Sequence, residues 1–247
     1  MSTQANDKTL TKIRAILAKA EDPAASPEEA QTYFAKAAEL MAKYGIEQTM
    51  LSAAKPKADK PNNRLIKIVG TYAKDRQQLL SYIAAALGAT TVLTRVYDQE
   101  TSKIVKAVDI FAFESDLDRI ELLYTSLLLQ AFNGMRQSRP LPGESTTSYR
   151  KTWLAGFAYA VYQRLKQAED TAAAEFEATS GQSVALVLAD RKSLCIAERD
   201  RKYRKLGKTP ERKLRGSGWG AGNEAGKRAD LGTGTRVGSG RRQALAA

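Results

Sequence analysis

The chain has 247 residues, a formal net charge of +12, one cysteine and no histidine. Without histidine, a Ser-His-Asp triad, a Cys-His pair and an HExxH zinc site are excluded, and one cysteine excludes an intrachain disulfide. The first ten residues lack the apolar segment of a secretory signal, and no apolar run reaches the length of a membrane span. We therefore expect a cytoplasmic protein that binds no cofactor and does not associate with a membrane.

The N-terminal part predicts a helical hairpin over residues 1–52. Residues 8–20 repeat apolar side chains at helical spacing. Ser26 and Glu29 have the spacing of a capping box, which predicts the start of a second helix. Gly45 follows the apolar stripe of that helix and is expected to end it.

A mixed helix and strand domain is predicted after the hairpin. Residues 53–63, rich in Lys, Pro and Asn, are interpreted as a linker, and residues 64–206 as the domain. Two β-branched segments around a polar turn predict a β-hairpin, and the remaining apolar patterns predict helices. The predicted strands are 90–97 and 103–113, and the predicted helices are 72–87, 116–136 (capped by Ser115 with Asp118), 147–178 and 186–205. Trp153 and Phe157 are expected in the core, and Cys195 as a small buried group. The fold class is therefore α+β and mostly helical, followed by a basic, Gly-rich, flexible tail at 207–247.

The N-terminal segment KIRAILAKAEDPAASPEEAQTYFAKAAELMAKYGI resembles an uncharacterised bacterial and phage domain family. The shared pattern has the form KIRxLLAxAED…SxxEAxxAxxKAxxLMxKYGI, and it includes Lys12, Arg14, Glu21, Met41 and Tyr44. Later segments, such as SYRKTWLAGFAYAVYQRL and AGKRADLG, are similar to actinobacterial members of that family. The resemblance implies the helical hairpin, and it implies no activity.

The positive charge is concentrated at the C-terminal end. Residues 191–247 carry 16 basic and 5 acidic side chains, a net +11, whereas the rest of the chain is nearly neutral. Lys and Arg neutralise phosphates, and aromatic rings stack on unpaired bases. We therefore interpret this region as a binding site for DNA or RNA, in a protein that is not an enzyme. The predicted binding residues are Arg199, Arg201, Lys202, Tyr203, Arg204, Lys205, Lys208, Arg212, Lys213, Arg215, Trp219, Lys227, Arg228, Arg236, Arg241 and Arg242.

Two alternatives stay open at this point. The helical hairpin could serve as an adaptor that binds a protein partner, which an exposed apolar patch on it would support. Asp109, Glu114 and Asp116 could instead form a carboxylate-metal nuclease site, which would require them to converge around a cavity. The simpler interpretation of Glu114 and Asp116 is a favourable interaction with a helix N-terminus.

Overall fold

The computed structural model describes residues 60–229 continuously. Before them it describes residues 11–13, 15, 16, 19, 33, 36, 40–46, 49 and 50. The elements are β1 (Pro61–Ile68), α3 (Ala73–Ala86), β2 (Thr90–Asp98), β3 (Lys103–Phe113), α4 (Glu114–Gln137), α5 (Thr146–Ser180), α6 (Val184–Lys202) and α7 (Trp219–Arg228). The predicted α+β, mostly helical fold class is confirmed.

The sheet has three antiparallel strands in the order β1-β3-β2. The predicted β-hairpin is present, with Arg95 opposite Lys106 and Asp98 opposite Lys103 across its turn. The third strand was not predicted: β1 begins at Pro61, inside the segment interpreted as a linker. Proline is tolerated there because it is the first residue of the strand, and β1 supplies the second partner that a marginal two-stranded hairpin needs.

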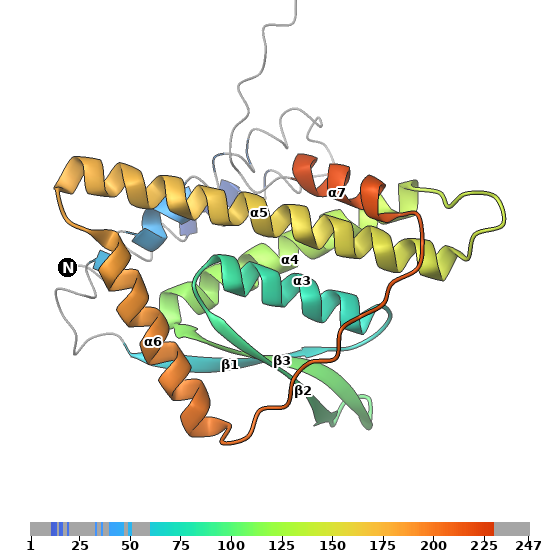
Figure 1. Cartoon of the computed structure of the whole chain (residues 1–247), viewed down its shortest axis with the longest axis horizontal. Helices are drawn as coiled ribbons and strands as arrows, with labels where there is room; N and C mark the ends of the chain where they lie inside the picture. Colours follow the sequence, from blue (N-terminus) through green and yellow to red (C-terminus); the bar gives the residue numbers. More distant parts are fainter. Residues whose placement is uncertain are drawn as a thin grey trace, which may run out of the picture.

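The two faces of β3 pack against different helices, as its period of two residues requires. Val108 and Ile110 belong to the main core, together with Leu80 and Ile83 of α3. Phe111, on the other face, packs with Cys195 of α6, which is buried as predicted. β3 is therefore covered on both sides, and Figure 1 shows the helices α3, α4 and α5 stacked on one side of the sheet.

The long helices follow their predicted ranges closely. Trp153 and Phe157 of α5 are almost fully buried, and their rings stack with centroids 5.5 Å apart, which confirms their predicted place in the core. The predicted cap of α4 is wrong, because the helix begins at Glu114 and its N-cap, Phe113, makes no side-chain hydrogen bond. The Asp118 carboxylate instead accepts a hydrogen bond from Arg64.

The described residues of the N-terminal hairpin are helical and pack onto the rest of the fold. Ile13 and Met41 are buried in the same core as the α3 side chains. Gly45 does not end its helix as predicted, since residues 40–46 are all helical. A Cβ at Gly45 would lie 1.9 Å from a guanidinium nitrogen of Arg119, so close packing explains this glycine. Ser26 and Glu29 lie outside the described residues.

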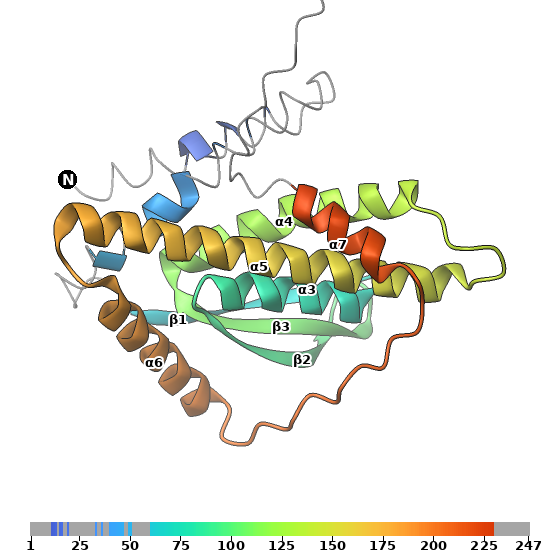
Figure 2. The same ribbon diagram turned by 45° about the horizontal axis from the view of Figure 1, so that its top comes forward.

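The C-terminal region differs from the expected flexible tail over 207–247, because α7 is an ordered helix packed on α5. Cβ atoms at Gly222 and Gly226 would lie 1.9 Å and 2.6 Å from the backbone oxygens of Trp153 and Phe157, so the absent side chains let the two backbones approach. The guanidinium of Arg164 on α5 donates to the carbonyl of Gly226 in α7 and to that of Ala229, the residue that follows the helix. Figure 2 shows α7 lying along α5. Residues 230–247 lie outside the described part.

Candidate nucleic-acid interface

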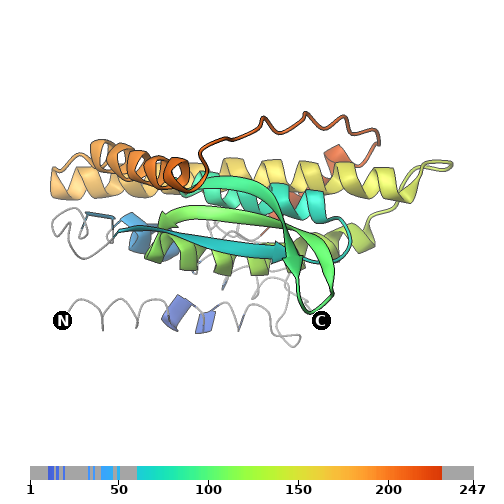
Figure 3. The same ribbon diagram turned by 90° about the horizontal axis from the view of Figure 1, so that it is seen from below.

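An extended segment, residues 203–218, connects α6 to α7, and we call it the strap. It contains neither helix nor strand over its 16 residues. The ribbon views show it leaving the end of α6 and passing on the side of the edge strand β2 and of α3 before it reaches α7 (Figure 1 and Figure 3). Irregular segments of this length are uncommon in compact domains and are usually either functional or linker segments. The side chains that contact the strap therefore determine which of its residues are held in place and which are available to a ligand.

The first anchor of the strap is the buried carboxylate of Asp109 on β3. The Tyr203 hydroxyl donates to Asp109 Oδ2 at 2.8 Å, and Lys202 Nζ lies 2.7 Å from the same oxygen. Burial, together with the hydrogen bond to Asp109, raises the pKa of Tyr203 to about 12. The Tyr203 ring meets Phe111 edge-on, with centroids 6.0 Å apart. Tyr203 therefore holds the strap to the sheet, and we assign it no role in base stacking.

The strap has two further anchors. In its middle, Arg212 donates to the buried Asp75 Oδ1 at 2.5 Å and to Gln78 Oε1 at 3.0 Å, both on α3. Near its end, the amide and hydroxyl of Ser217 donate to the two carboxylate oxygens of Glu144, at 2.7 Å and 2.6 Å. These hydrogen bonds lower the pKa of Glu144. The strap is thus held at both ends and at one internal point.

Five of the predicted binding cations lie on the strap between these anchors and are exposed. They are Arg204, Lys205, Lys208, Lys213 and Arg215. Within the part of the chain that the structure describes, none of these five has a carboxylate partner. An exposed cation without an internal partner is available to an external anion. The strap therefore separates into anchoring residues and free cations, a division that the sequence does not show.

The other predicted binding residues have different surroundings. Arg199 pairs with Asp200, Arg201 with Glu198, and Lys227 with Glu224. Trp219 is 49% exposed and packs beside Tyr159, at 6.1 Å between ring centroids. Arg228 is exposed at the last residue of α7. Arg236, Arg241 and Arg242 lie outside the described residues. Among the described residues, internal ion pairs thus neutralise part of the C-terminal charge and leave other cations, such as Arg228, at the surface.

A groove with a volume of about 1200 Å³ runs between the strap and the body of the protein, and we call it the strap groove. Its walls come from α3, β2, β3, α5 and residues 207–214 of the strap. Seven cations and one carboxylate line it: Lys74, Arg95, Lys106, Lys151, Lys208, Arg212, Lys213 and Glu211. Of the cations, only Arg212 has an ion pair in the described part of the chain. The groove therefore has a strongly positive lining.

Two of the groove cations are direct neighbours in the sheet. Arg95 on β2 lies opposite Lys106 on β3, so their side chains project from the same face. Like charges at directly opposed positions destabilise a sheet. No carboxylate bonds to either side chain among the described residues. The fold thus tolerates a local repulsion here, and an anion in the groove would relieve it.

Sequence reasoning missed four groove cations: Lys74, Arg95, Lys106 and Lys151. The hairpin turn offered a signal for two of them, because a turn centred on residues 99–102 places residue 95 opposite residue 106. Lys74 and Lys151 reach the groove through the packing of α3 and α5, which no local pattern encodes. The cation-lined surface is therefore broader than the C-terminal charge cluster.

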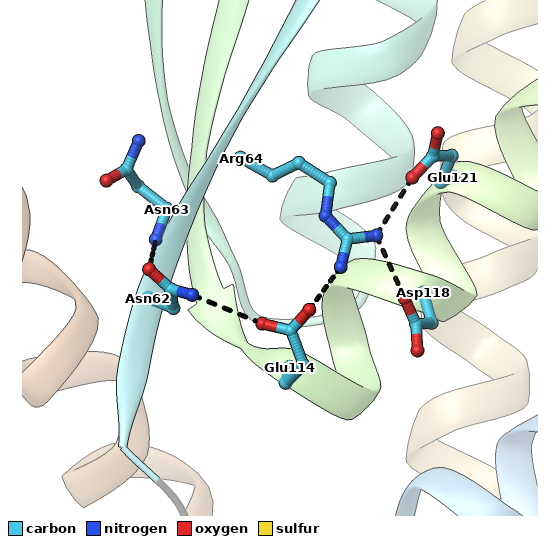
Figure 4. Close-up of polar contacts among 6 residues, drawn as sticks. All are labelled: Asn62, Asn63, Arg64, Glu114, Asp118 and Glu121. Carbon is cyan, nitrogen blue, oxygen red and sulfur yellow. Dashed lines mark hydrogen bonds and ion pairs between the residues drawn. The ribbon is translucent and has the colours of Figure 1, made fainter. Parts of the chain in front are cut away.

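The carboxylates proposed for a metal site do not converge. Asp109 anchors the strap, and Asp116 binds Arg119 and Arg191. Glu114 bonds to Arg64 and accepts from Asn62. Figure 4 shows that Asp118 and Glu121 also point at the Arg64 guanidinium, with N–O distances of 2.9 Å and 2.8 Å. In residues 60–229 and the described parts before them, no group of three such side chains has the arrangement of a metal site. This geometry gives the nuclease alternative no support.

The adaptor alternative depends on an exposed apolar surface on the hairpin. Ile13, Met41, Tyr44 and Ile46 are all at least 95% buried. Ile46 packs with Ala172 and Val184, which belong to α5 and α6. Among the hairpin residues that the structure describes, large apolar side chains are therefore turned toward the protein's own interior, and none is exposed.

The structure is therefore that of a mostly helical α+β protein with a cation-lined groove beneath an anchored strap. Residues 8–48 match the model of a family described as "Protein of unknown function (DUF2786)". The match confirms the family resemblance of the N-terminal motif, and the strap groove lies outside the matched segment. No curated protein and no solved structure matches the chain. No helix among the described residues has both the length and the apolar character of a transmembrane span.

Proposed function

We propose that this protein is a non-enzymatic nucleic-acid-binding protein that holds the phosphate backbone at the strap and the strap groove. The observation that carries the proposal is the concentration of unpaired cations around one groove, while neighbouring cations have internal partners. The binding set is revised accordingly. Lys202, Tyr203 and Arg212 hold the strap, whereas Lys208 and Lys213 face the ligand together with the four groove cations of the body.

Counterion release supplies the binding free energy in this mechanism. Each phosphate that a Lys or Arg neutralises lowers the slope of log K against log salt by about 0.7 for a single strand and about 0.9 for a duplex. Near 0.1 M salt, the loss of one contact then weakens binding by roughly fivefold. Such a site binds many sequences, since phosphate contacts carry no base information. We further propose a cytoplasmic location, where the buried Cys195 would remain a thiol.

The test compares two charge-matched variants of the full chain. Lys208→Gln with Lys213→Gln removes two free strap cations. Lys60→Gln with Lys166→Gln is the control: Lys60 precedes the end of β1 farthest from Lys106, and Lys166 lies about 22 Å along α5 from the groove residue Lys151. Fluorescence anisotropy with labelled 20-nucleotide DNA and RNA, single-stranded and duplex, measures affinity at two salt concentrations.

The strap variant is expected to bind roughly 25-fold more weakly near 0.1 M salt, while the control keeps most of its affinity. Equal affinities of the two variants would contradict the proposed site. Absence of salt-dependent binding by the wild-type protein would contradict the function. Competition by polyglutamate as effective as competition by an oligonucleotide of equal length would instead indicate an acidic protein ligand.

Point substitutions are preferable to a truncation at residue 207. Truncation would also remove α7, whose glycines Gly222 and Gly226 lie directly on the backbone of α5. It would break the Arg212–Asp75 pair as well and leave a buried carboxylate without its cation. Loss of binding after truncation would therefore mix loss of charge with loss of structure.

A further inference from the structure

We infer that the strap groove takes a single-stranded nucleic acid in preference to a duplex, an inference that rests on the proposed function. The strap covers one side of the groove and is fastened at Tyr203, Arg212 and Ser217. In the inferred arrangement a single strand lies along the groove and leaves the strap in place. A duplex is wider and would have to displace the middle of the strap, which means separating Arg212 from the buried Asp75.

The floor of the groove offers surface for bases as well as for phosphates. Leu93 and Arg95 of β2 both line the groove, and Tyr97 lies on the same strand face about 7 Å beyond Arg95. Leu93 is 41% exposed and Tyr97 is 62% exposed, and Ile104, opposite Tyr97, is 72% exposed. Apolar and aromatic groups thus flank the Arg95–Lys106 cation pair on one face of the sheet.

This alternation of cations and apolar groups matches the chemistry of a single strand. Unpaired bases present their faces, and aromatic side chains on an exposed sheet surface stack on them. A duplex encloses its bases and presents mainly phosphates, so Leu93, Tyr97 and Ile104 would bury little surface against it. The cations around the groove then hold the phosphates: Lys74 from α3, Lys151 from α5, and Lys208 with Lys213 from the strap.

The C-terminal segment of the chain itself is a poor occupant on charge grounds. Residues 230–247 contain three arginines and one aspartate, so this segment carries the same sign of charge as the groove. A ligand with regularly spaced negative charges and exposed apolar faces satisfies both features of the lining.

The test compares Tyr97→Ala with Tyr97→Phe in the full-length protein. The probes are a labelled 20-nucleotide mixed-sequence DNA, its RNA equivalent, and duplexes of each with its complement. The wild-type protein is expected to bind a single strand at least tenfold more tightly than a duplex of the same length. Tyr97→Ala is expected to lose about fivefold or more in single-strand affinity with little change for duplex, whereas Tyr97→Phe keeps the ring and the affinity. Tyr97 is largely exposed, so neither variant removes core packing.

Trypsin provides a second measurement, since it cleaves after the free strap cations Lys205, Lys208 and Lys213. A single strand beneath the strap is expected to protect these bonds, and a duplex is not. Equal affinity for the two forms, together with no effect of Tyr97→Ala, would overturn the single-strand inference while the proposed function stood. Failure of the wild-type protein to bind any of the four probes would overturn both.

Discussion

Replacing Gly222 by alanine should destabilise the protein through the contact between α7 and α5. The new Cβ would lie 1.9 Å from the backbone oxygen of Trp153 and 2.6 Å from its carbonyl carbon. The neighbouring atoms belong to the backbone of a long helix, so they do not move aside as a flexible side chain would. The two helices must separate, and the strap end that α7 holds must move with them.

Two opposing effects set the size of the change in the free energy of unfolding. Overpacking of a well-packed contact costs about 1–3 kcal/mol. Alanine in place of glycine inside a helix contributes about 0.5–1 kcal/mol in the opposite direction. Gly220 isolates the second effect, because it lies in α7 and a Cβ there would meet no atom within 4 Å. We expect Gly222→Ala to lower the free energy of unfolding by about 1–2 kcal/mol, and Gly220→Ala to raise it by about 0.5–1 kcal/mol.

Thermal unfolding followed by circular dichroism measures both variants against the wild-type protein. For a chain of this size, 1 kcal/mol corresponds to roughly 2–4 °C in Tm. The Tm of Gly222→Ala should therefore fall by several degrees while that of Gly220→Ala rises. If both variants shifted Tm in the same direction by the same amount, the close contact between α7 and α5 would be refuted.

Three further predictions concern the anchors and the hairpin turn. Arg212→Met should cost about 3 kcal/mol because it leaves Asp75 buried without its cation, and adding Asp75→Asn should recover part of that loss in urea denaturation. The raised pKa of Tyr203 predicts that its contribution to the stability of the fold is complete below pH 10 and is lost as the pH rises toward 12. In a titration followed by phenolate absorbance, the component near pH 12 should be missing in Tyr203→Phe. The bond from Lys67 and those from Thr101 lower the pKa of Asp98 to about 2, so stability should be lost as pH falls from about 4 to about 2. Asp98→Asn should reduce this loss of stability at acid pH. An unchanged pH dependence would count against the contacts of Asp98 with Lys67 and Thr101.

The local patterns predict most of the secondary structure because hydrophobic periodicity is a local property. The stripe around Trp153 and Phe157 gives a buried helix face, and the turn at residues 99–102 gives the hairpin. The strand β1 escaped prediction because Pro61 and its Asn neighbours have the composition of a linker. Its strand conformation comes from pairing with β3, which is remote in sequence.

The sequence predicts that the candidate site is positively charged, but it does not predict which residues form it. Arg212 and Lys208 look equivalent in the sequence, yet only Arg212 meets a buried carboxylate, and that carboxylate is 137 residues away on α3. Gly222 and Gly226 suggest flexibility from composition alone, whereas their physical role is close packing on α5. Long-range partners decide both cases.

The central claim is that unpaired cations at the strap groove hold a nucleic-acid backbone, and the salt dependence of one variant tests it most directly. Arg95→Gln with Lys106→Gln removes the opposed cation pair and should leave the fold at least as stable, since it relieves a like-charge contact. For a single-stranded oligonucleotide, the slope of log K against log salt should become shallower by about 1.4, with the Lys60→Gln, Lys166→Gln control unchanged. A slope equal to that of the wild-type protein would contradict the claim.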